Sequence, residues 1–262
     1  MLSSLTRSRA LAVCALPIAA LVAVAGFAPL PFVVAEPGMT ANVLGEHRGK
    51  PVITVSGAPT RTTKGALRMT TIVATGPSAE VGLGDVIDGW FRTDQAILPR
   101  ESVYPAGQSD KEVERRNVKD MEESQGDATR AALSYLDEDP AKVKVTLHLA
   151  DVGGPSAGLL FSLGIIDKLD GNGKGGDLTG GRSIAGTGTI TADGKVGEVG
   201  GVSLKTQAAK RDGATVFLVP KGECSDARAE LPEGLRLIPV TTLNGAVESL
   251  RALDAGGKVP SC

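Results

Sequence analysis

The sequence predicts a fold of mixed strands and helices that follows an apolar N-terminal segment. Three observations support this prediction. Residues 10–35 carry no charged side chain, residues 141–253 alternate between strand and helix patterns, and glycine is concentrated between Gly153 and Gly201. That last stretch holds 16 of the 34 glycines, which is more than ordinary loops require. We therefore expect the functional site to lie within it.

The composition of the 262 residues excludes several classes of function. Hydrophobic residues make up 42% of the chain, which is enough for one ordinary globular domain with accessory segments. Acidic residues outnumber basic ones by 30 to 28, and only eight residues are Phe, Trp or Tyr. This composition argues against nucleic-acid binding, which favours a basic surface and aromatic side chains for base stacking. The chain is also too short for a typical domain fused to an ATP-driven motor.

The apolar segment at 10–35 is 26 residues long and follows Arg7 and Arg9. A helix of that length exceeds a hydrocarbon core of about 30 Å. We therefore expect a single-pass membrane anchor, with the rest of the chain extracytoplasmic because the two arginines retain the N-terminus in the cytoplasm. The alternative is a secretory signal that is cleaved after Val33-Val34-Ala35, which would release the remaining chain.

The three cysteines agree with export. Cys14 lies in the apolar segment, whereas Cys224 and Cys262 lie in the part expected outside the cytoplasm, where a disulfide can persist. A bridge between them would attach the C-terminal end to an internal loop; two buried free thiols are the alternative. No metal site is expected, because His47 and His148 are the only histidines and no CxxC pattern occurs.

Short strands, loops and charged helices are expected between the apolar segment and residue 136. The break between two helices is placed at Gly126, and the charged side chains of the first helix are expected to face solvent. A capping box at Ser109–Glu112 begins that helix. The predicted elements are strands at Val52–Ser56 and Leu67–Ala74 and helices from Ser109 to about Met121 and from Asp127 to Leu136.

From residue 141 onward, strands and helices alternate. The first strand, Lys142–Leu149, places its apolar residues on one face and His148 on the other, so that this histidine is expected at the surface. A loop rich in Gly, Asn and Asp at 170–181 is expected to be mobile and near the cleft. The remaining predicted elements are a helix at Pro155–Leu169, a strand at Ser183–Thr191 with a hairpin turn at Asp193-Gly194, a helix at Leu204–Arg211, a strand at Thr215–Val219, a short helix at about Ser225–Glu230, a strand at Leu235–Val240 and a helix at Leu243–Leu253.

The segment GGPSAG at 153–158 places a serine at the start of a helix. Pro155 suits the first helical turn, so Ser156 lies beside unpaired backbone N–H groups that can stabilise an oxyanion. The backbone at Gly154, Pro155 and Ala157 is the candidate oxyanion site. The alternative is that Ser156 only caps the helix.

A serine nucleophile needs a base, and Lys205 is the candidate. It lies at the start of a helix of small residues that can pack closely, and burial would lower its pKa so that it is neutral before attack. His47 and His148 are weaker candidates because both are expected at the surface. Lys195 and Lys210 are expected to be solvated.

Two segments carry a resemblance to a known family: GGPSAG at 153–158 and TGTITADGKVGEVGGVSLKTQAAKRDGATVFLVP at 187–220. Together they resemble the proteolytic domain of Lon-type serine proteases. The resemblance implies an α+β fold of mixed sheets with packed helices. It also implies a Ser/Lys dyad formed by Ser156 and Lys205, with Thr187 supporting the lysine by a hydrogen bond.

A second, partial copy of the serine motif occurs at Gly76-Pro77-Ser78-Ala79. It lacks the closing glycine and a following apolar helix, and is expected to be a loop. No GxxxxGK[ST] phosphate loop occurs in the sequence, so the chain is most similar to the membrane-anchored, ATP-independent bacterial Lon-like proteases. Those proteins share the GGDLT loop at 175–179 and usually carry a PDZ domain. Only Asp137–Ala141 separates the predicted helix from the next strand, so we expect PDZ to be missing.

The expected domains are an anchor or signal at 1–35, an extracytoplasmic strand, loop and helix region at 36–126, and a protease domain at 127–262. The resulting hypothesis is an ATP-independent serine endopeptidase that cleaves exported or envelope proteins, needs no cofactor and forms homo-oligomers, as Lon-type domains commonly do. Two alternatives remain open. One is a non-catalytic envelope scaffold that retains the fold; the other is a phosphate or nucleotide binder, whose GxGxxG or Lys-Ser/Thr signature is missing.

Overall fold

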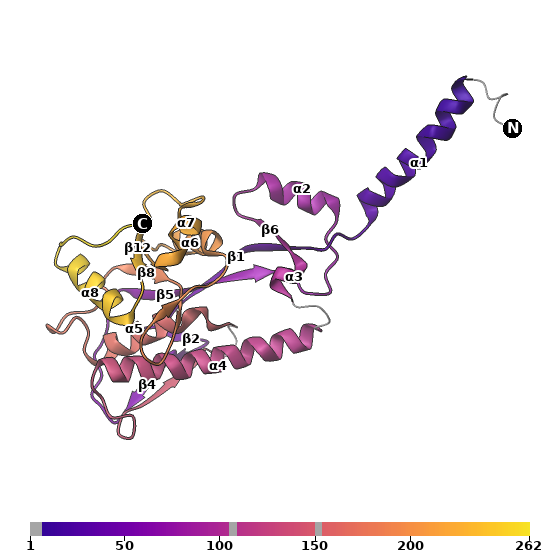
Figure 1. Ribbon diagram of the computed structural model, residues 1–262. Coiled ribbons are helices and arrows are strands. Elements are labelled where there is room, and N and C mark those ends of the chain that lie inside the picture. The colour runs from indigo at the N-terminus through magenta and orange to yellow at the C-terminus, as the bar shows by residue number, and fades with distance from the viewer. Residues whose placement is uncertain (1–6, 105–108, 150–153) are drawn as a thin grey trace. The chain divides into compact units, whose positions relative to one another are not determined.

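A computed structural model describes residues 7–104, 109–149 and 154–262 (Figure 1). The chain divides into two compact units. Unit 1 contains the residues up to Ala35 together with Ala74–Asp110, and unit 2 contains Glu36–Val73 together with Lys111–Cys262. The segment from 36 to 73 thus belongs with the C-terminal half of the chain, although residues of unit 1 separate the two in sequence.

Unit 1 combines helices with a short antiparallel strand pair, in which Phe32 lies opposite Pro99 and Ala35 opposite Ala96. Ser78, the serine of the partial motif, lies outside helices and strands, and its hydroxyl donates to Asp110 Oδ1 at 3.1 Å. The expected loop is therefore confirmed. The elements are α1 (Arg7–Phe27), the first residues of β1 (Phe32–Asn42), α2 (Leu83–Phe91), β6 (Ala96–Pro99) and α3 (Arg100–Val103).

The apolar N-terminal segment does not form one helix over residues 10–35. α1 ends at Phe27, before Pro29 and Pro31, whose rings oppose continuation of a helix. Val33–Ala35, the expected cleavage site, lie in β1, where they pair with β6. No helix within the described ranges is both long and apolar enough to cross a membrane. The expected membrane-spanning helix is therefore not found.

Unit 2 is built around a sheet with the strand order β12-β11-β8-β5-β1, in which β5 runs parallel to β8, β8 to β11 and β11 to β12. Parallel neighbours need crossover connections, and α6 and α7 provide two of them. The mixed α+β fold is thus confirmed. The elements are β2 (Glu46–His47), β3 (Lys50–Pro51), β4 (Ile53–Ser56), β5 (Ala66–Ala74), α4 (Asp110–Tyr135), β7 (Lys144–Leu147), η1 (Pro155–Ala157), α5 (Gly158–Leu169), β8 (Ser183–Gly186), β9 (Thr189–Ile190), β10 (Val196–Gly197), α6 (Val202–Arg211), β11 (Val216–Pro220), η2 (Lys221–Glu223), α7 (Cys224–Arg228), β12 (Arg236–Val240) and α8 (Leu243–Asp254).

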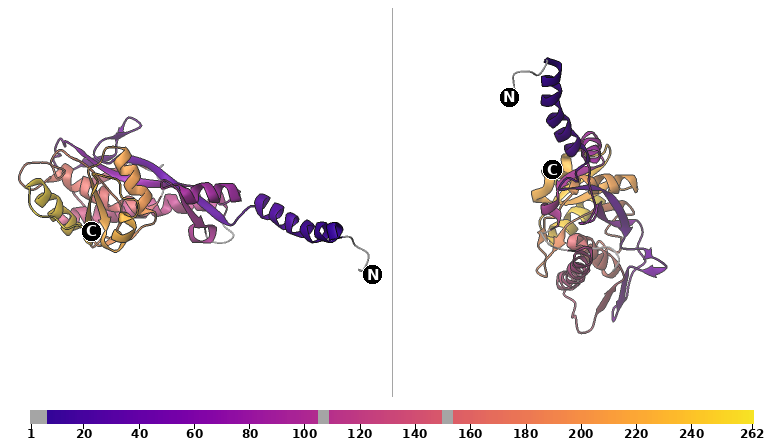
Figure 2. Two further views of the ribbon diagram at one scale, coloured as in Figure 1. Left: turned by 90° about the horizontal axis from the view of Figure 1, so that it is seen from above. Right: turned by 90° about the vertical axis from the view of Figure 1, so that its right-hand side faces the viewer.

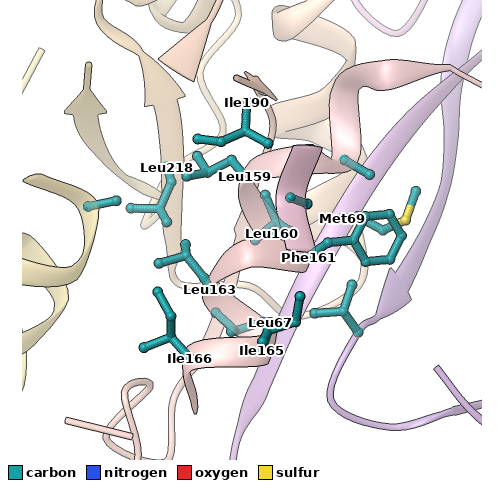
Figure 3. Close-up of a cluster of buried hydrophobic side chains, with 14 of the residues drawn as sticks. Leu67, Met69, Leu159, Leu160, Phe161, Leu163, Ile165, Ile166, Ile190 and Leu218 are labelled. Atoms are coloured by element: carbon teal, nitrogen blue, oxygen red, sulfur yellow. The ribbon is translucent and has the colours of Figure 1, made fainter. Parts of the chain in front are cut away.

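α5 forms the centre of the core, since every residue from Gly158 to Asp167 is buried. Its apolar side chains pack against residues of β5, β9 and β11 (Figure 3). Burial of each such side chain contributes about 1.5–3 kcal/mol. The helix that follows the candidate serine is therefore rigidly placed. The labelled cluster consists of Leu67, Met69, Leu159, Leu160, Phe161, Leu163, Ile165, Ile166, Ile190 and Leu218.

α4 is one helix from Asp110 to Tyr135, as all views show, and the break expected at Gly126 is wrong (Figures 1 and 2). A glycine inside a helix costs only about 1 kcal/mol relative to alanine. Residues on both sides of Gly126 are buried in unit 2, among them Met121 and Ala128, and this packing offsets the cost. The charged first half is largely exposed, as expected.

Candidate active site

Ser156 lies in η1, the single turn that leads into α5. The residue before this turn, Gly154, has φ of +97°, a backbone angle that residues with a Cβ rarely adopt. A Cβ at Gly154 would meet nothing within 4 Å, so the backbone angle rather than lack of space requires glycine. Ser156 is partly exposed, whereas Ala157 after it is fully buried. The serine is therefore accessible on a fixed turn.

The connection between β8 and β9 holds the serine turn from one side. The Ser156 carbonyl oxygen accepts a hydrogen bond from the Gly188 amide at 2.9 Å and another from the Thr187 hydroxyl at 3.3 Å. Thr187 is fully buried, and its own amide donates to the Leu218 carbonyl in β11 at 3.1 Å. Thr187 thus links the turn to the central sheet.

α4 holds the serine turn from the other side. The Ser124 hydroxyl donates to the Pro155 carbonyl at 2.9 Å, and the Gly154 amide donates to the Asn117 carbonyl at 3.3 Å. A Cβ at Gly158 would lie 2.9 Å from Ser124 Oγ and 2.8 Å from a methyl carbon of Ile190, so glycine permits this close approach. A weak signal for Ser124 was present in the sequence, because Ser124 is the first of several small residues at helical spacing.

These contacts reduce the number of backbone amides that could donate to an oxyanion. Pro155 has no N–H group, and the amide of Gly154 is already donated to Asn117. The first amides of a helical turn have no partner within that turn. The donors that remain are therefore the amides of Ser156 and Ala157, and the expected contributions of Gly154 and Pro155 are not supported.

Lys205 lies in the first half of α6, and only 3% of it is exposed. Burial lowers the pKa of its amine to about 8, and the negative charges of Glu223 and Asp226 partly oppose this effect. A pKa near 8 leaves the neutral amine accessible at physiological pH. Lys195 is exposed as expected, whereas Lys210 is half-buried.

The predicted residues converge on the end of β8. Thr187 follows that strand directly and contacts Ser156, and α6, which carries Lys205, packs against the same strand. The Thr187 hydroxyl donates to the Ser156 carbonyl. Across the described ranges, no hydrogen bond joins the Lys205 amine to Thr187 or to the Ser156 hydroxyl.

Sequence reasoning missed the two acidic residues beside Lys205. Glu223 Oε1 accepts from the Val199 amide at 3.0 Å, and Asp226 Oδ2 accepts from the Val202 amide at 2.9 Å. Both acids lie in the short segment after β11, three positions apart, which places them on one face of a helix. That spacing was the available signal.

The remaining candidates lie outside this site. Cys224 and Cys262 form a disulfide that attaches the C-terminal residue to α7. His47 is half-buried in β2, and His148 is exposed after β7. In the part of the chain that the structure describes, no group of three His, Cys, Asp or Glu side chains is placed to hold a metal ion.

Comparison with known proteins agrees with this geometry. The family model of the Lon protease (S16) C-terminal proteolytic domain matches residues 120–251, which include Ser156, Thr187 and Lys205. Similar curated proteins are the Lon protease of Chloroflexus aggregans, 38% identical over 94 residues (34% of this chain, 11% of that protein), that of Roseiflexus castenholzii, 32% over 124 residues (42% and 15%), and that of Clostridioides difficile, 36% over 114 residues (41% and 14%). The chain thus spans less than a fifth of the length of these relatives.

Proposed function

The chain belongs to the family of Lon protease (S16) C-terminal proteolytic domains, and from this premise we propose that it is a serine endopeptidase with Ser156 as nucleophile and Lys205 as base. One observation carries the proposal. Lys205 is almost completely buried, burial lowers its pKa to about 8, and its helix packs on β8, the strand that ends beside Thr187, which contacts the serine turn. An ordinary surface lysine has none of these properties.

The proposed reaction uses only groups of this chain. Neutral Lys205 takes the proton of the Ser156 hydroxyl while Oγ attacks the carbonyl carbon of a peptide bond. The amides of Ser156 and Ala157 donate to the oxygen that becomes negative. The protonated lysine then gives its proton to the leaving amine, and the acyl-enzyme forms. A water molecule, deprotonated by the same lysine, hydrolyses this ester and restores both residues.

The remaining expectations are part of the proposal. ATP independence is supported by the lack of a phosphate-loop sequence. Export is supported by the uncharged segment after Arg9 and by the disulfide between Cys224 and Cys262, which persists in oxidising compartments. The substrates would then be exported or envelope proteins. A missing PDZ domain is supported by the short connection between α4 and β7, and a homo-oligomeric ring stays a prediction from the resemblance.

Cleavage of casein by the full chain without ATP tests the proposal. Ser156→Ala and Lys205→Ala are expected to abolish cleavage. Ser78→Ala is the matched control, because Ser78 follows the same Gly-Pro pair in unit 1 and its hydroxyl donates to Asp110, outside the proposed site. Cleavage that persists in Ser156→Ala would overturn the assignment, and acceleration by added ATP would contradict ATP independence.

A covalent serine probe separates the enzyme from a non-catalytic scaffold. A fluorophosphonate should label the native chain at Ser156 and should not label Ser156→Ala. The reaction requires an activated hydroxyl, so Lys205→Ala should slow the labelling as well. A chain that cleaves nothing and takes no label at Ser156 would instead support the scaffold.

A further inference from the structure

Two carboxylates hold the backbone that leads into the Lys205 helix. Glu223 accepts the amide of Val199, and Asp226 accepts the amide of Val202, the first residue of α6. Between these anchor points, Gly201 has φ of +66°, a left-handed conformation that favours glycine, directly before α6 begins. The direction in which α6 begins, and with it the position of Lys205, depends on this pair of contacts.

Only one of the two carboxylate oxygens of Glu223 accepts a hydrogen bond in the described part of the chain. Its Oε1 is used by Val199, whereas Oε2 is buried and has no hydrogen-bond partner in the described part of the chain. A buried carboxylate oxygen without a donor is unfavourable unless a positive charge lies nearby. Burial raises the pKa of Glu223, and the Val199 hydrogen bond and the positive charge of Lys205 partly oppose this effect, whereas the negative charges of Glu198 and Asp226 add to it.

The segment that carries both acids is fastened independently of them. α6 and α7 lie side by side (Figure 1), and the Cys224–Cys262 disulfide packs with Val199 on a small apolar cluster. Arg228 adds a hydrogen bond to the Cys262 carbonyl at 3.2 Å. The acids are therefore held by a covalent bond and by packing, and they can in turn hold α6.

We propose that Glu223, with Asp226 beside it, is a positioning residue for Lys205, which it orients by anchoring the start of α6 and whose charge it balances. This inference rests on the proposed function and names a role that its Ser/Lys chemistry does not include. Among the described residues, no hydrogen bond joins Glu223 to the serine turn, so it acts through the lysine.

The electrostatic consequence follows from the opposing effects at Lys205. Burial favours the neutral amine, and the acids favour the ammonium ion. The lysine must be neutral to accept the serine proton and charged to protonate the leaving amine, so a pKa near the working pH serves both steps. The charged groups that face this amine are Glu223 and Asp226, and Glu198 acts on Glu223 in turn. The acids thus keep burial from making the lysine too weak a base.

Two substitutions at one position separate anchoring from charge. In Glu223→Gln the amide oxygen can still accept the Val199 hydrogen bond, but the charge is lost. The rising limb of kcat/KM with pH should then move toward lower pH by roughly one unit, with kcat retained at high pH. In Glu223→Ala the acceptor is lost too, so kcat at high pH should fall roughly tenfold in addition to the same shift of the limb, while KM stays nearly constant. Glu233→Gln removes an exposed charge from the following loop and should change neither quantity.

The reactivity of Lys205 provides a readout that does not depend on cleavage. Acetylation of the amine, followed by mass spectrometry from pH 6 to 10, should show the same shift for Glu223→Gln, and circular dichroism should confirm that each variant is folded. If the native protein and Glu223→Gln have identical acetylation profiles and the same dependence of kcat/KM on pH, the inference is overturned. Failure of the proposed function looks different, because casein would stay uncut while the acetylation profiles still differ.

Discussion

Two buried ionisable side chains of unit 2, Lys205 and Asp167, have similar burial and different partners. Burial moves both pKa values toward the uncharged form, to about 8 for Lys205 and to about 6 for Asp167. Asp167 Oδ1 accepts the Leu178 amide at 2.7 Å, and Arg61 lies 3.9 Å from the same oxygen. Lys205 has no such hydrogen bond in the described ranges and faces Glu223 through space. We therefore expect Asp167 to be structural and Lys205 to be available for proton transfer.

The glycine-rich loop at 170–181 is held by Arg61, which also lies near Asp167, and, among the described residues, not by the serine turn. Arg61 donates to the Gly175 carbonyl at 2.9 Å, and the Asn172 side chain accepts the Gly176 amide at 3.0 Å. α5 has 12 residues, so about 18 Å separates its two ends. Because Ser156 precedes one end and the loop follows the other, α5 separates them, and these contacts do not support the expectation that the loop borders the cleft.

Substitution of the two buried groups should give opposite results. Lys205→Met is expected to lower kcat/KM for casein roughly 10²–10⁴-fold, because the base is removed from the reaction. Asp167→Asn is expected to keep kcat/KM within about threefold, since the amide oxygen can still accept the Leu178 hydrogen bond. If both variants lose similar factors of kcat/KM at equal folded fractions, the distinction between Lys205 and Asp167 is wrong.

Reduction of the Cys224–Cys262 disulfide should destabilise unit 2, in which the disulfide fastens the segment that carries the acids beside Lys205. Its closed loop spans 38 positions, and loss of the bridge is expected to lower the free energy of unfolding by about 3–4 kcal/mol. Unfolding in guanidinium chloride with and without dithiothreitol measures this difference. The double variant Cys224→Ser/Cys262→Ser should match the reduced protein, whereas Cys14→Ser, at an exposed free thiol, should not change it.

The stability contribution of Asp167 should depend on pH in the direction opposite to that of an ion-paired carboxylate. Its folded pKa of about 6 lies above the ordinary value of 3.8 for an aspartate, so the folded chain holds the proton more tightly than the unfolded chain. The free energy of unfolding should therefore fall by up to about 3 kcal/mol as pH rises from about 4 to 6. Thermal unfolding of native protein and Asp167→Asn over this range should diverge. Parallel curves would mean that Asp167 is fully paired when ionised.

A smaller effect is expected at Thr187, whose hydroxyl donates to the carbonyl of Ser156. Thr187→Val removes this donor at nearly constant volume and should lower kcat about fivefold, which corresponds to about 1 kcal/mol. Thr187→Ser keeps the hydroxyl and should restore most of the rate. If the serine variant is no better than the valine variant, packing rather than the hydrogen bond explains the role of Thr187.

Local patterns predicted much of unit 2. The helix after Pro155 and the hairpin at Asp193-Gly194 were found as expected, and the helix of Lys205 begins only two residues earlier than predicted. These elements depend on contacts within a few residues, such as helical spacing of apolar side chains and turn residues at fixed positions. Prediction failed where packing overrides a local signal. Gly126 does not end α4, and the last residues of the apolar N-terminal segment pair as a strand.

The residues that are chemically suited to the site can be recognised without a structure, because a serine at a Gly-Pro helix start and a lysine among small residues are properties of short segments. The other groups that act on them can be recognised only once the chain is folded. Ser124, Glu223 and Asp226 reach the site through hydrogen bonds between segments far apart in the chain. The pKa of Lys205 likewise depends on burial and on charges from another helix, and neither is encoded in its neighbours along the sequence.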